Sequence, residues 1–498
     1  MSIESGDAKT KEVVELTEER AHDIEGSVPS AGDEKYPVTP SERVRLLRKI
    51  DLYVLPPISI LFFLAYLDRS NIGNAKLYNL LADLNMTSEE YLVCLSVFFV
   101  GYCAFEIPSN IMLKLLSPKV WLPTIMIVWG LVSTLMALSS SYGGLLTARF
   151  LLGATEAGVF PGAIFYLSMW YGRRALVTRL TLFNSSISIA GAFGGLLAWA
   201  IGKMDGIGHK SGWFWIFTLE GIATILVALS GYFFVRRFPR EDKFLSEREK
   251  STLETILRED NDSFRDEKFS WSEVRKAFND YKCWLYMISW MGIALPEYSL
   301  TLFLPTIIKN LGYTAAKAQL LTVPPNAVAF FCAVGGALLS QKISRRAPII
   351  IFALSIASMG YIILLTDATV CVQYLGTFFA TCGMMTASAL QFTWVATNVS
   401  GQTKRAVATA IQISFGDIGA VIGCQMYRPN QVPRYWLGHG MSLGFLVISI
   451  VASTLLWFLL NRENARRDVI TDGPPKDQSF ISEPDFQGDD DVRWRFIV

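Results

Sequence analysis

Long apolar stretches alternate with short polar segments along most of the chain. A helix that crosses a bilayer needs about 20 mostly apolar residues, and twelve stretches of the sequence meet this requirement. The first six are expected near residues 50–70, 91–112, 120–139, 143–166, 178–202 and 213–235. The second six are expected near residues 283–305, 320–340, 347–366, 371–396, 405–426 and 438–460. The pattern predicts an all-α membrane protein with twelve transmembrane helices.

Polar segments divide the chain into domains. Residues 1–45 and 461–498 are too polar to bury a core of their own, so we expect two disordered cytoplasmic tails. Residues 236–282 form a highly charged linker between residues 46–235 and residues 283–460, which hold six predicted spans each. Two six-helix halves joined by a charged linker are the layout of a two-half secondary transporter.

Lysine and arginine are unevenly shared between the two sets of loops. Loops on the side of the N-terminus carry more than twice as many as the opposite loops, which places both termini in the cytoplasm. We expect the plasma membrane as the location. Asn85-Met86-Thr87 then lies in an outside loop and is a candidate glycosylation site, whereas the sequon at Asn261 lies inside.

Composition argues against several other classes of function. Only 18% of residues are charged and the net charge is +1, so no global field favours nucleic acid. The seven cysteines are scattered through apolar runs, so we expect small buried thiols rather than a metal site or disulfides. No phosphate-binding loop or nucleophile elbow occurs, so neither an enzyme nor a cofactor is expected.

Four ionisable residues fall inside predicted spans 1 and 4, where each costs about 2.5–3.5 kcal/mol to insert. Asp68 and Arg69 are adjacent, so their side chains diverge by about 100° and reach different neighbours. Arg149 and Glu156 are seven residues apart, on one helix face and about 10 Å from each other. Asp68 and Arg149 lie at similar depth, which predicts an ion pair between them.

Two interpretations of these four residues remain open. One is a static ion-pair cluster that holds spans 1 and 4 together. The other is a proton-coupling site, because a carboxylate in a low-dielectric interior is readily protonated. Glu156 has no cation nearby on its own helix and is the better proton carrier. The three histidines lie in a tail, a loop and a span end, so carboxylates must carry the protons.

Other carboxylates in the spans are ambiguous. Glu297 and Asp417 either line a cavity or hydrogen-bond to a neighbouring helix, whereas Glu106 and Glu220 fit a structural role better. Asp417 stands among small residues in the segment 414–419, which predicts close helix packing.

Five segments together resemble one known family. They are Leu-Asp-Arg-Ser-Asn-Ile-Gly-Asn-Ala-Lys at 67–76, Glu-Ile-Pro-Ser-Asn at 106–110, Arg-Phe-Leu-Leu-Gly-Ala-Thr-Glu-Ala-Gly at 149–158 with Pro-Gly at 161–162, Leu-Phe-Leu-Pro-Thr-Ile-Ile at 302–308, and Thr-Lys-Arg-Ala-Val-Ala-Thr-Ala at 403–410. Over residues 45–460 the chain resembles the fungal anion:cation symporter family of the major facilitator superfamily. This is the branch of allantoate, nicotinate, pantothenate and related vitamin permeases.

The resemblance implies the major facilitator fold and a role for each charge in spans 1 and 4. Arg69 corresponds to the arginine that contacts the substrate carboxylate. Asp68 and Glu156 correspond to carboxylates implicated in proton coupling, and Arg149 to the arginine that pairs with the aspartate. Asp417 stands where relatives often carry Asn, and Asn326 where Tyr is frequent; both departures bear on substrate choice.

The candidate substrate-binding residues are charged, aromatic or amide side chains in the predicted spans. They are Arg69, Glu297, Trp394, Asp417 and Asn326. Phe392 and Tyr298 are further candidates to stack on a ring, although aromatic residues in spans more often serve packing.

The expected function is import of a small organic carboxylate together with protons, by alternating access, through a monomer in the lipid bilayer. A proton-coupled exporter is an alternative, but exporters usually carry Gly-Pro in span 5, and residues 190–195 lack proline. A nutrient sensor that binds without transporting is a second alternative. The sequence does not decide which carboxylate is carried.

Overall fold

A computed structural model describes residues 39–260, 270–432, 434–475, 486 and 488–498. The described residues from Arg45 to Val498 belong to one compact unit. The described residues are helical or irregular and contain no β-strand.

Among the described residues, twelve helical segments are long and apolar enough to cross a membrane. This confirms the predicted number of spans and makes the chain a multi-pass membrane protein. The first six are α2 (Pro40–Ala75), α4 (Ser88–Leu116), α5 (Pro118–Met136), α6 with α7 (Tyr142–Glu156 and Val159–Trp170), α8 (Arg173–Ile201) and α9 (Gly212–Phe234). The second six are α12 (Tyr281–Asn310), α14 (Val323–Ile343), α15 (Ala347–Leu365), α16 (Val370–Asn398), α17 (Gln402–Cys424) and α18 (Trp436–Ile470).

Short helices lie between the spans and, in the case of η6, after the last span. They are α3 (Leu80–Asp83), η1 (Gly202–Met204), η2 (Ile207–His209), α10 (Glu247–Asp260), α11 (Trp271–Asn279), α13 (Ala315–Leu320), η4 (Pro429–Gln431) and η6 (Gly488–Asp490). The linker predicted as a polar stretch thus contains α10 and α11. Lys49 of α2 forms an ion pair with Glu249 of α10 at 2.8 Å. The sequon at Asn261 lies outside the described residues.

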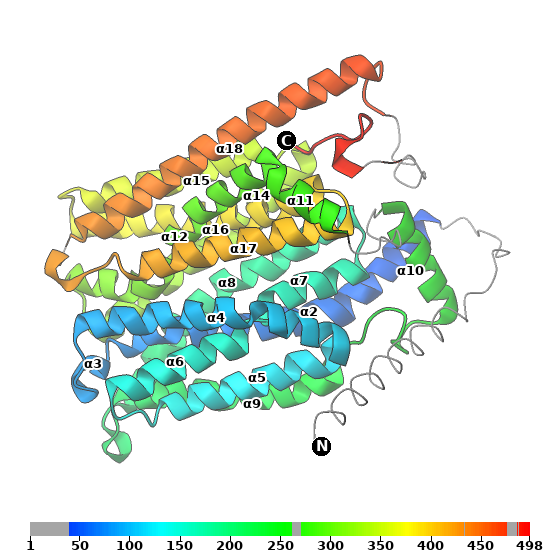
Figure 1. Cartoon of the computed structure of the whole chain (residues 1–498). Coiled ribbons are helices and arrows are strands. Elements are labelled where there is room, and N and C mark those ends of the chain that lie inside the picture. The colour runs from blue at the N-terminus through cyan, green and yellow to red at the C-terminus, as the bar shows by residue number, and fades with distance from the viewer. Residues whose placement is uncertain (1–38, 261–269, 433, 476–485, 487) are drawn as a thin grey trace, which may run out of the picture. The chain divides into compact units, whose positions relative to one another are not determined.

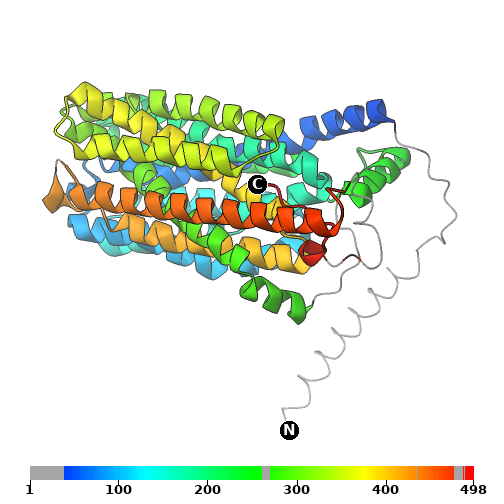
Figure 2. The same ribbon diagram turned by 90° about the horizontal axis from the view of Figure 1, so that it is seen from above.

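Successive spans run in opposite directions, so the bundle has two ends (Figure 1). We call the end that bears α10 and α11 the linker end, and the end that bears α3 the far end. Helices α2 and α4–α9 form the N-terminal half, and helices α12–α18 form the C-terminal half. A view turned by 90° shows the same long helices lying side by side (Figure 2).

The fourth span is broken directly after Glu156. Helix α6 ends at that residue, and α7 begins at Val159. Pro161 lacks the N–H that would bond to the carbonyl four residues earlier, which is the usual cause of such a break. The carboxylate of Glu156 therefore lies at a helix end in the middle of a span.

The two halves meet along α4 with α17 and along α8 with α14 and α16. Near the far end, the Tyr78 hydroxyl donates to Gln319 Oε1 at 2.8 Å, and Gln425 Nε2 donates to Ser96 Oγ at 2.7 Å. Nearer the linker end, the rings of Phe160 and Phe392 are 5.0 Å apart. Contacts between the halves therefore lie on both sides of the bundle centre.

The cysteine prediction is only partly right. Cys94, Cys283 and Cys424 are buried and Cys382 is intermediate, whereas Cys103, Cys332 and Cys371 are exposed in the chain alone. In a transmembrane bundle an exposed apolar helix face is covered by lipid, so thiols are tolerated there as well as in the core.

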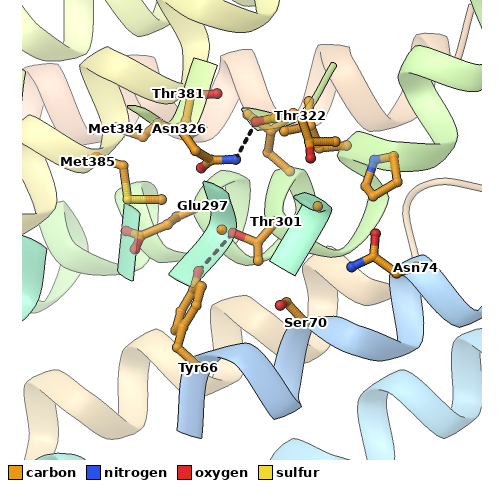
Figure 3. Close-up of a pocket in the computed structure, with 15 residues that line it drawn as sticks. Tyr66, Ser70, Asn74, Glu297, Thr301, Thr322, Asn326, Thr381, Met384 and Met385 are labelled. Carbon is orange, nitrogen blue, oxygen red and sulfur yellow. Dashed lines mark hydrogen bonds between the residues drawn. The ribbon is translucent and has the colours of Figure 1, made fainter. Parts of the chain in front are cut away.

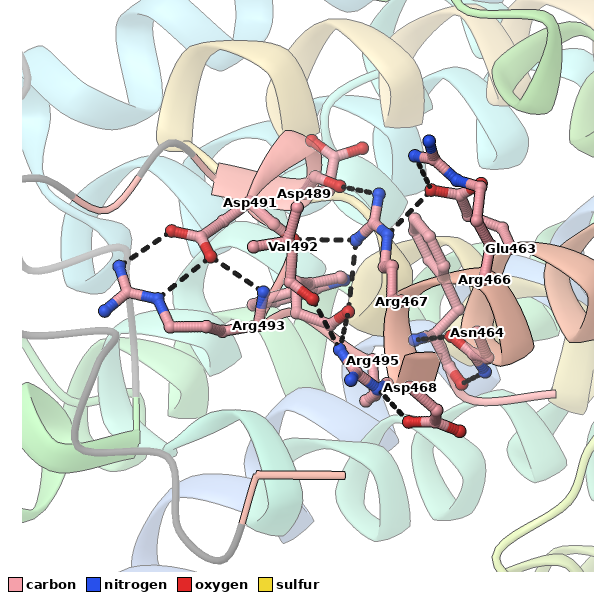
Figure 4. A network of polar contacts seen from close by, with 12 residues as sticks. Glu463, Asn464, Arg466, Arg467, Asp468, Asp489, Asp491, Val492, Arg493 and Arg495 are labelled. Atoms are coloured by element: carbon pink, nitrogen blue, oxygen red, sulfur yellow. Dashed lines mark hydrogen bonds and ion pairs between the residues drawn. The ribbon is translucent and has the colours of Figure 1, made fainter. Parts of the chain in front are cut away.

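The C-terminal segment is not the disordered tail that its composition predicts, at least over the described residues 488–498. Figure 4 shows its polar contacts with α18. Arg467, which is 4% exposed, donates to the backbone carbonyls of Asp489, Asp491 and Trp494 at 2.9–3.0 Å. Asp489 also accepts from Lys404 Nζ at 2.7 Å. The acidic run thus satisfies buried cations, which composition alone does not reveal.

The last residues of this segment contact other helices of the C-terminal half. Trp394 Nε1 donates to the Ile497 carbonyl at 2.8 Å, and the backbone N–H of Arg346 donates to the Val498 carbonyl at 2.8 Å. These partners, like Lys404 and Arg467, lie at the linker end of α15–α18. The segment therefore ties together helix ends within one half.

Arg467→Ala should lower the apparent melting temperature of the purified protein by several degrees. The substitution leaves three backbone carbonyls without their donor, at a cost of about 3 kcal/mol or more. Arg466→Ala is the matched control, because Arg466 is exposed and pairs with Glu463 on the surface. Equal melting temperatures for the two variants, measured by fluorescence on heating, would contradict the anchoring role of Arg467.

Candidate functional site

A cavity lies between the two halves at mid-bundle. Its wall combines polar and aromatic side chains from α2, α4, α7, α8, α12, α16 and α17. The lining residues are Phe62, Tyr66, Arg69, Tyr102, Phe160, Asn184, Ile187, Trp290, Glu297, Tyr298, Ser388, Phe392, Ile413, Gly416 and Asp417. We call it the central cavity. Three of the predicted substrate-binding residues, Arg69, Glu297 and Asp417, line it.

Arg69 forms a buried ion pair with Glu156. Its Nε and one terminal nitrogen donate to Glu156 Oε1 at 3.1 and 2.6 Å, and its other terminal nitrogen donates to the Tyr298 hydroxyl at 3.3 Å. The arginine is 7% exposed and the glutamate 1% exposed. Glu156 Oε2 has no hydrogen-bond partner. One edge of the guanidinium is thus occupied by a protein carboxylate, next to the cavity.

Close packing of α4 against α6 places the ring of Phe98 next to both Arg69 and Arg149. A Cβ on Gly153 would lie 2.0 Å from the carbonyl oxygen of Phe98, so only glycine allows this approach. The Phe98 ring centroid is 5.1 Å from the guanidinium carbon of Arg69 and 5.0 Å from that of Arg149. Cation–π attraction therefore stabilises both buried cations.

The predicted ion pair between Asp68 and Arg149 is wrong. Asp68 Oδ2 accepts hydrogen bonds from Trp129 Nε1 of α5 and Thr224 Oγ1 of α9, both at 2.9 Å. Similar depth did not suffice for pairing, because Asp68 faces α5 and α9 rather than α6. Arg149 Nε and one of its terminal nitrogens have no hydrogen-bond partner.

The static four-residue cluster is therefore not formed either. Asp68 and Arg69 do reach different neighbours, as their adjacent positions on α2 predict. Asp68 belongs to a polar contact within the N-terminal half and lines neither described cavity. One turn along, Asn71 Nδ2 donates to Glu220 of α9, in keeping with the structural role expected for that glutamate.

Asp417 reaches the central cavity because α17 packs closely on α12. A Cβ on Gly416 would lie 2.2 Å from Trp290 Nε1, and one on Gly423 would lie 2.4 Å from Ser299 Oγ. This confirms the close packing predicted from the small residues. Asp417 Oδ2 accepts from Cys103 Sγ of α4 at 3.6 Å, across the boundary between the halves.

A second cavity adjoins the first on the side of the far end. We call it the far cavity. It is lined by Tyr66, Ser70, Asn74, Gly191, Gly195, Glu297, Leu300, Thr301, Leu304, Pro305, Thr322, Asn326, Thr381, Met384 and Met385, most of which Figure 3 labels. Tyr66 and Glu297 line both cavities. Asn326, predicted as a substrate ligand, lines the far cavity and donates to the Thr322 carbonyl at 2.9 Å.

Trp394 does not lie where a substrate-stacking residue is needed. It lines neither cavity, and its indole is bonded to the C-terminal segment. Phe392 and Tyr298, by contrast, both line the central cavity. Sequence reasoning missed Tyr66 and Tyr102, although Tyr66 stands one helical turn before Arg69 and thus on the same face of α2.

This arrangement allows one specific exchange of partners. A planar guanidinium binds a carboxylate best through two parallel N–H groups. Arg69 presents such an edge, and Glu156 occupies it. A carboxylate that enters the central cavity competes with Glu156 for that edge. If it succeeds, Glu156 becomes an unpaired buried carboxylate, which is costly unless it takes up a proton.

Comparison with known proteins gives the family. The sequence profile described as Major Facilitator Superfamily matches residues 58–424. The chain is 36% identical over 472 residues to the MFS-type transporter cnsO of Penicillium expansum, covering 92% of this chain and 91% of that protein. It is 33% identical over 440 residues to the high-affinity nicotinic acid transporter of Saccharomyces cerevisiae, covering 88% and 81%.

Solved structures of transporters share the fold. A bacterial homologue of the human lysosomal transporter Spinster, in an inward-facing and occupied conformation, aligns with a TM-score of 0.61 at 17% identity over 86% of this chain and 98% of that one. The proton:xylose symporter XylE aligns with a TM-score of 0.61 at 14% identity over 82% and 96%. Likeness at this level of identity concerns the fold alone.

Proposed function

The chain belongs to the major facilitator superfamily and is a transporter rather than an enzyme, and from this premise we propose that it imports a small organic carboxylate together with protons. The observation that carries the proposal is the Arg69–Glu156 ion pair beside the central cavity. The arginine supplies a recognition site for an anion, and the glutamate supplies a group that changes protonation when the anion binds.

The transport cycle follows from the competition between Glu156 and the substrate carboxylate for Arg69. When the site is open to the outside, Glu156 takes up a proton and releases Arg69, which then receives the substrate carboxylate. The two halves rock around the occupied site. On the cytoplasmic side, loss of the proton restores the Glu156 carboxylate, which recaptures Arg69 and displaces the anion. In neither step does Arg69 or Glu156 remain in the membrane as an unpaired charge.

Asp68 and Arg149 have supporting roles in this proposal. Asp68 Oδ1 has no hydrogen-bond partner, so this carboxylate is a second candidate for proton binding, located behind Arg69 rather than at the substrate. Arg149 is fully buried on the same helix as Glu156. Its positive charge favours the ionised form of Glu156 and so assists loss of the proton in the step that releases the substrate.

The substrate class rests on chemistry and on one relative. Arginine at a polar and aromatic cavity favours a carboxylate with an apolar body. The nicotinic acid transporter of Saccharomyces cerevisiae shares 33% identity with the chain, and the motifs resemble the fungal anion:cation symporter branch. Nicotinate, allantoate, pantothenate and similar carboxylates are therefore the candidates.

Import rather than export depends on how the bundle sits in the membrane. The excess of lysine and arginine on the loops of the linker end supports a cytoplasmic linker end in the plasma membrane. Asn85, on the far end, is exposed and is followed by Thr87, so it is available to glycosylation there. A monomer is sufficient, because both halves of the site come from one chain.

Glu156→Gln should abolish net proton-driven uptake while preserving exchange of labelled for unlabelled substrate. Glutamine resembles the protonated glutamate and cannot release the proton. A pH difference of one unit drives about tenfold accumulation per coupled proton, and this accumulation should disappear. The measurement is uptake and counterflow in proteoliposomes.

Glu220→Gln serves as control for this variant, because Glu220 is an equally buried span carboxylate that contacts neither Arg69 nor either cavity. Normal uptake by Glu156→Gln would refute the coupling role. An exporter would accumulate substrate only when the pH gradient has the opposite direction.

Arg69→Lys should weaken carboxylate binding by about tenfold or more while leaving the protein folded. Lysine keeps the charge but loses the two parallel donors, and a hydrogen bond to a charged group is worth about 1.5–3 kcal/mol. Apparent affinity is read from the concentration dependence of uptake. An unchanged affinity would remove Arg69 from the substrate site.

Asn85→Gln should remove a glycosidase-sensitive shift in gel mobility, because the far end faces outside in this proposal. Thr87→Ala, which destroys the sequon but keeps the asparagine, should do the same. A wild-type protein without any such shift would contradict the assignment of Asn85.

A further inference from the structure

The far cavity has one carboxyl side chain, Glu297, for which the described residues supply no ion-pair partner. Glu297 is the one charged residue among the described residues that line it. The side chain is 3% exposed, and its Oε2 has no hydrogen-bond partner. No described lysine, arginine or histidine forms an ion pair with it. An ionised buried carboxylate without a partner costs several kcal/mol, so Glu297 either holds a proton or binds a donor that enters the cavity.

A second buried polar atom in the lining of this cavity also lacks a hydrogen-bond partner. Asn74 Oδ1 is buried and has no hydrogen-bond partner. Like Glu297 Oε2, it is an acceptor. Across the cavity, the Tyr66 and Thr301 hydroxyls bond to each other, and Asn326 Nδ2 donates to the Thr322 carbonyl (Figure 3). Two acceptor atoms of residues that line the cavity are therefore without a donor.

The far cavity and the central cavity share part of their lining. Glu297 and Tyr66 belong to the walls of both cavities. Tyr298, the residue after Glu297, bonds to Arg69 in the central cavity. A ligand whose carboxylate binds Arg69 can therefore extend past Tyr66 and present its other end to Glu297.

From these contacts we propose that the substrate is a carboxylate with a hydrogen-bond-donating nitrogen at its other end, and that Glu297 binds this nitrogen. The inference rests on the proposed function, because Arg69 must first receive the carboxylate. An amine suits the site best, since its positive charge offsets the Glu297 carboxylate and its N–H groups reach the free acceptor atoms. A hydroxyl supplies a donor without the charge, and a methyl group supplies neither.

Three probes of similar size separate these possibilities: 4-aminobutyrate, 4-hydroxybutyrate and pentanoate. Their relative affinities are read from the concentration dependence of thermal stabilisation of the purified full-length protein. We expect 4-aminobutyrate to bind about tenfold more tightly than pentanoate and more tightly than 4-hydroxybutyrate, as a charge-assisted hydrogen bond implies.

Glu297→Gln should abolish the preference for the amine while retaining binding of pentanoate. Glu220→Gln, which neutralises a buried carboxylate away from both cavities, should keep the wild-type preference. Because the readout is a ratio of affinities within each variant, a general loss of stability does not imitate the effect.

The outcomes distinguish this inference from the proposed function. Binding of pentanoate as tight as that of 4-aminobutyrate, or a preference that survives in Glu297→Gln, would overturn the inference and leave the carboxylate site intact. An equal affinity for 4-hydroxybutyrate would overturn the choice of nitrogen. Failure of all three carboxylates to stabilise the wild-type protein would overturn the proposed function and this inference with it.

Discussion

The ion pair between Arg69 and Glu156 is the interaction on which the transport proposal depends. Both side chains are almost entirely buried, and their atoms approach to 2.6 Å. In a low-dielectric interior each of these charges is costly without the other. Glu156 occupies the edge of the guanidinium that Nε and one terminal nitrogen form, so a substrate anion that takes this edge displaces Glu156 from it. This displacement couples binding of an anion to the protonation of a protein group.

The residues around the Arg69–Glu156 pair keep their own partners during this exchange. Phe98 stacks on Arg69 and Arg149, so both cations retain an aromatic partner whatever happens to the carboxylates. Asp68 is held by Trp129 and Thr224 within the N-terminal half. The break of the fourth span after Glu156 places that carboxylate at a helix end, where the backbone is less constrained than within a continuous helix.

Much of the fold follows from the sequence because span length is set by bilayer thickness. The twelve spans and the close approach of α17 to α12 were predictable from apolar length and small residues. The partner of Asp68 was not, because depth along a helix says nothing about which neighbour a side chain faces. Trp394 and the acidic C-terminal run were misread for a related reason. Both bind partners far away in the chain, and composition carries no trace of such pairing.

The account is tested most directly by counting the protons that are exchanged when a carboxylate binds. Isothermal titration calorimetry of the purified protein with a carboxylate that it binds, repeated in buffers of different protonation enthalpy, gives this number. Displacement of Glu156 from Arg69 predicts uptake of about one proton per carboxylate near neutral pH, and none in Glu156→Gln. Binding of the carboxylate to the wild-type protein with a heat that is independent of the buffer would contradict the account.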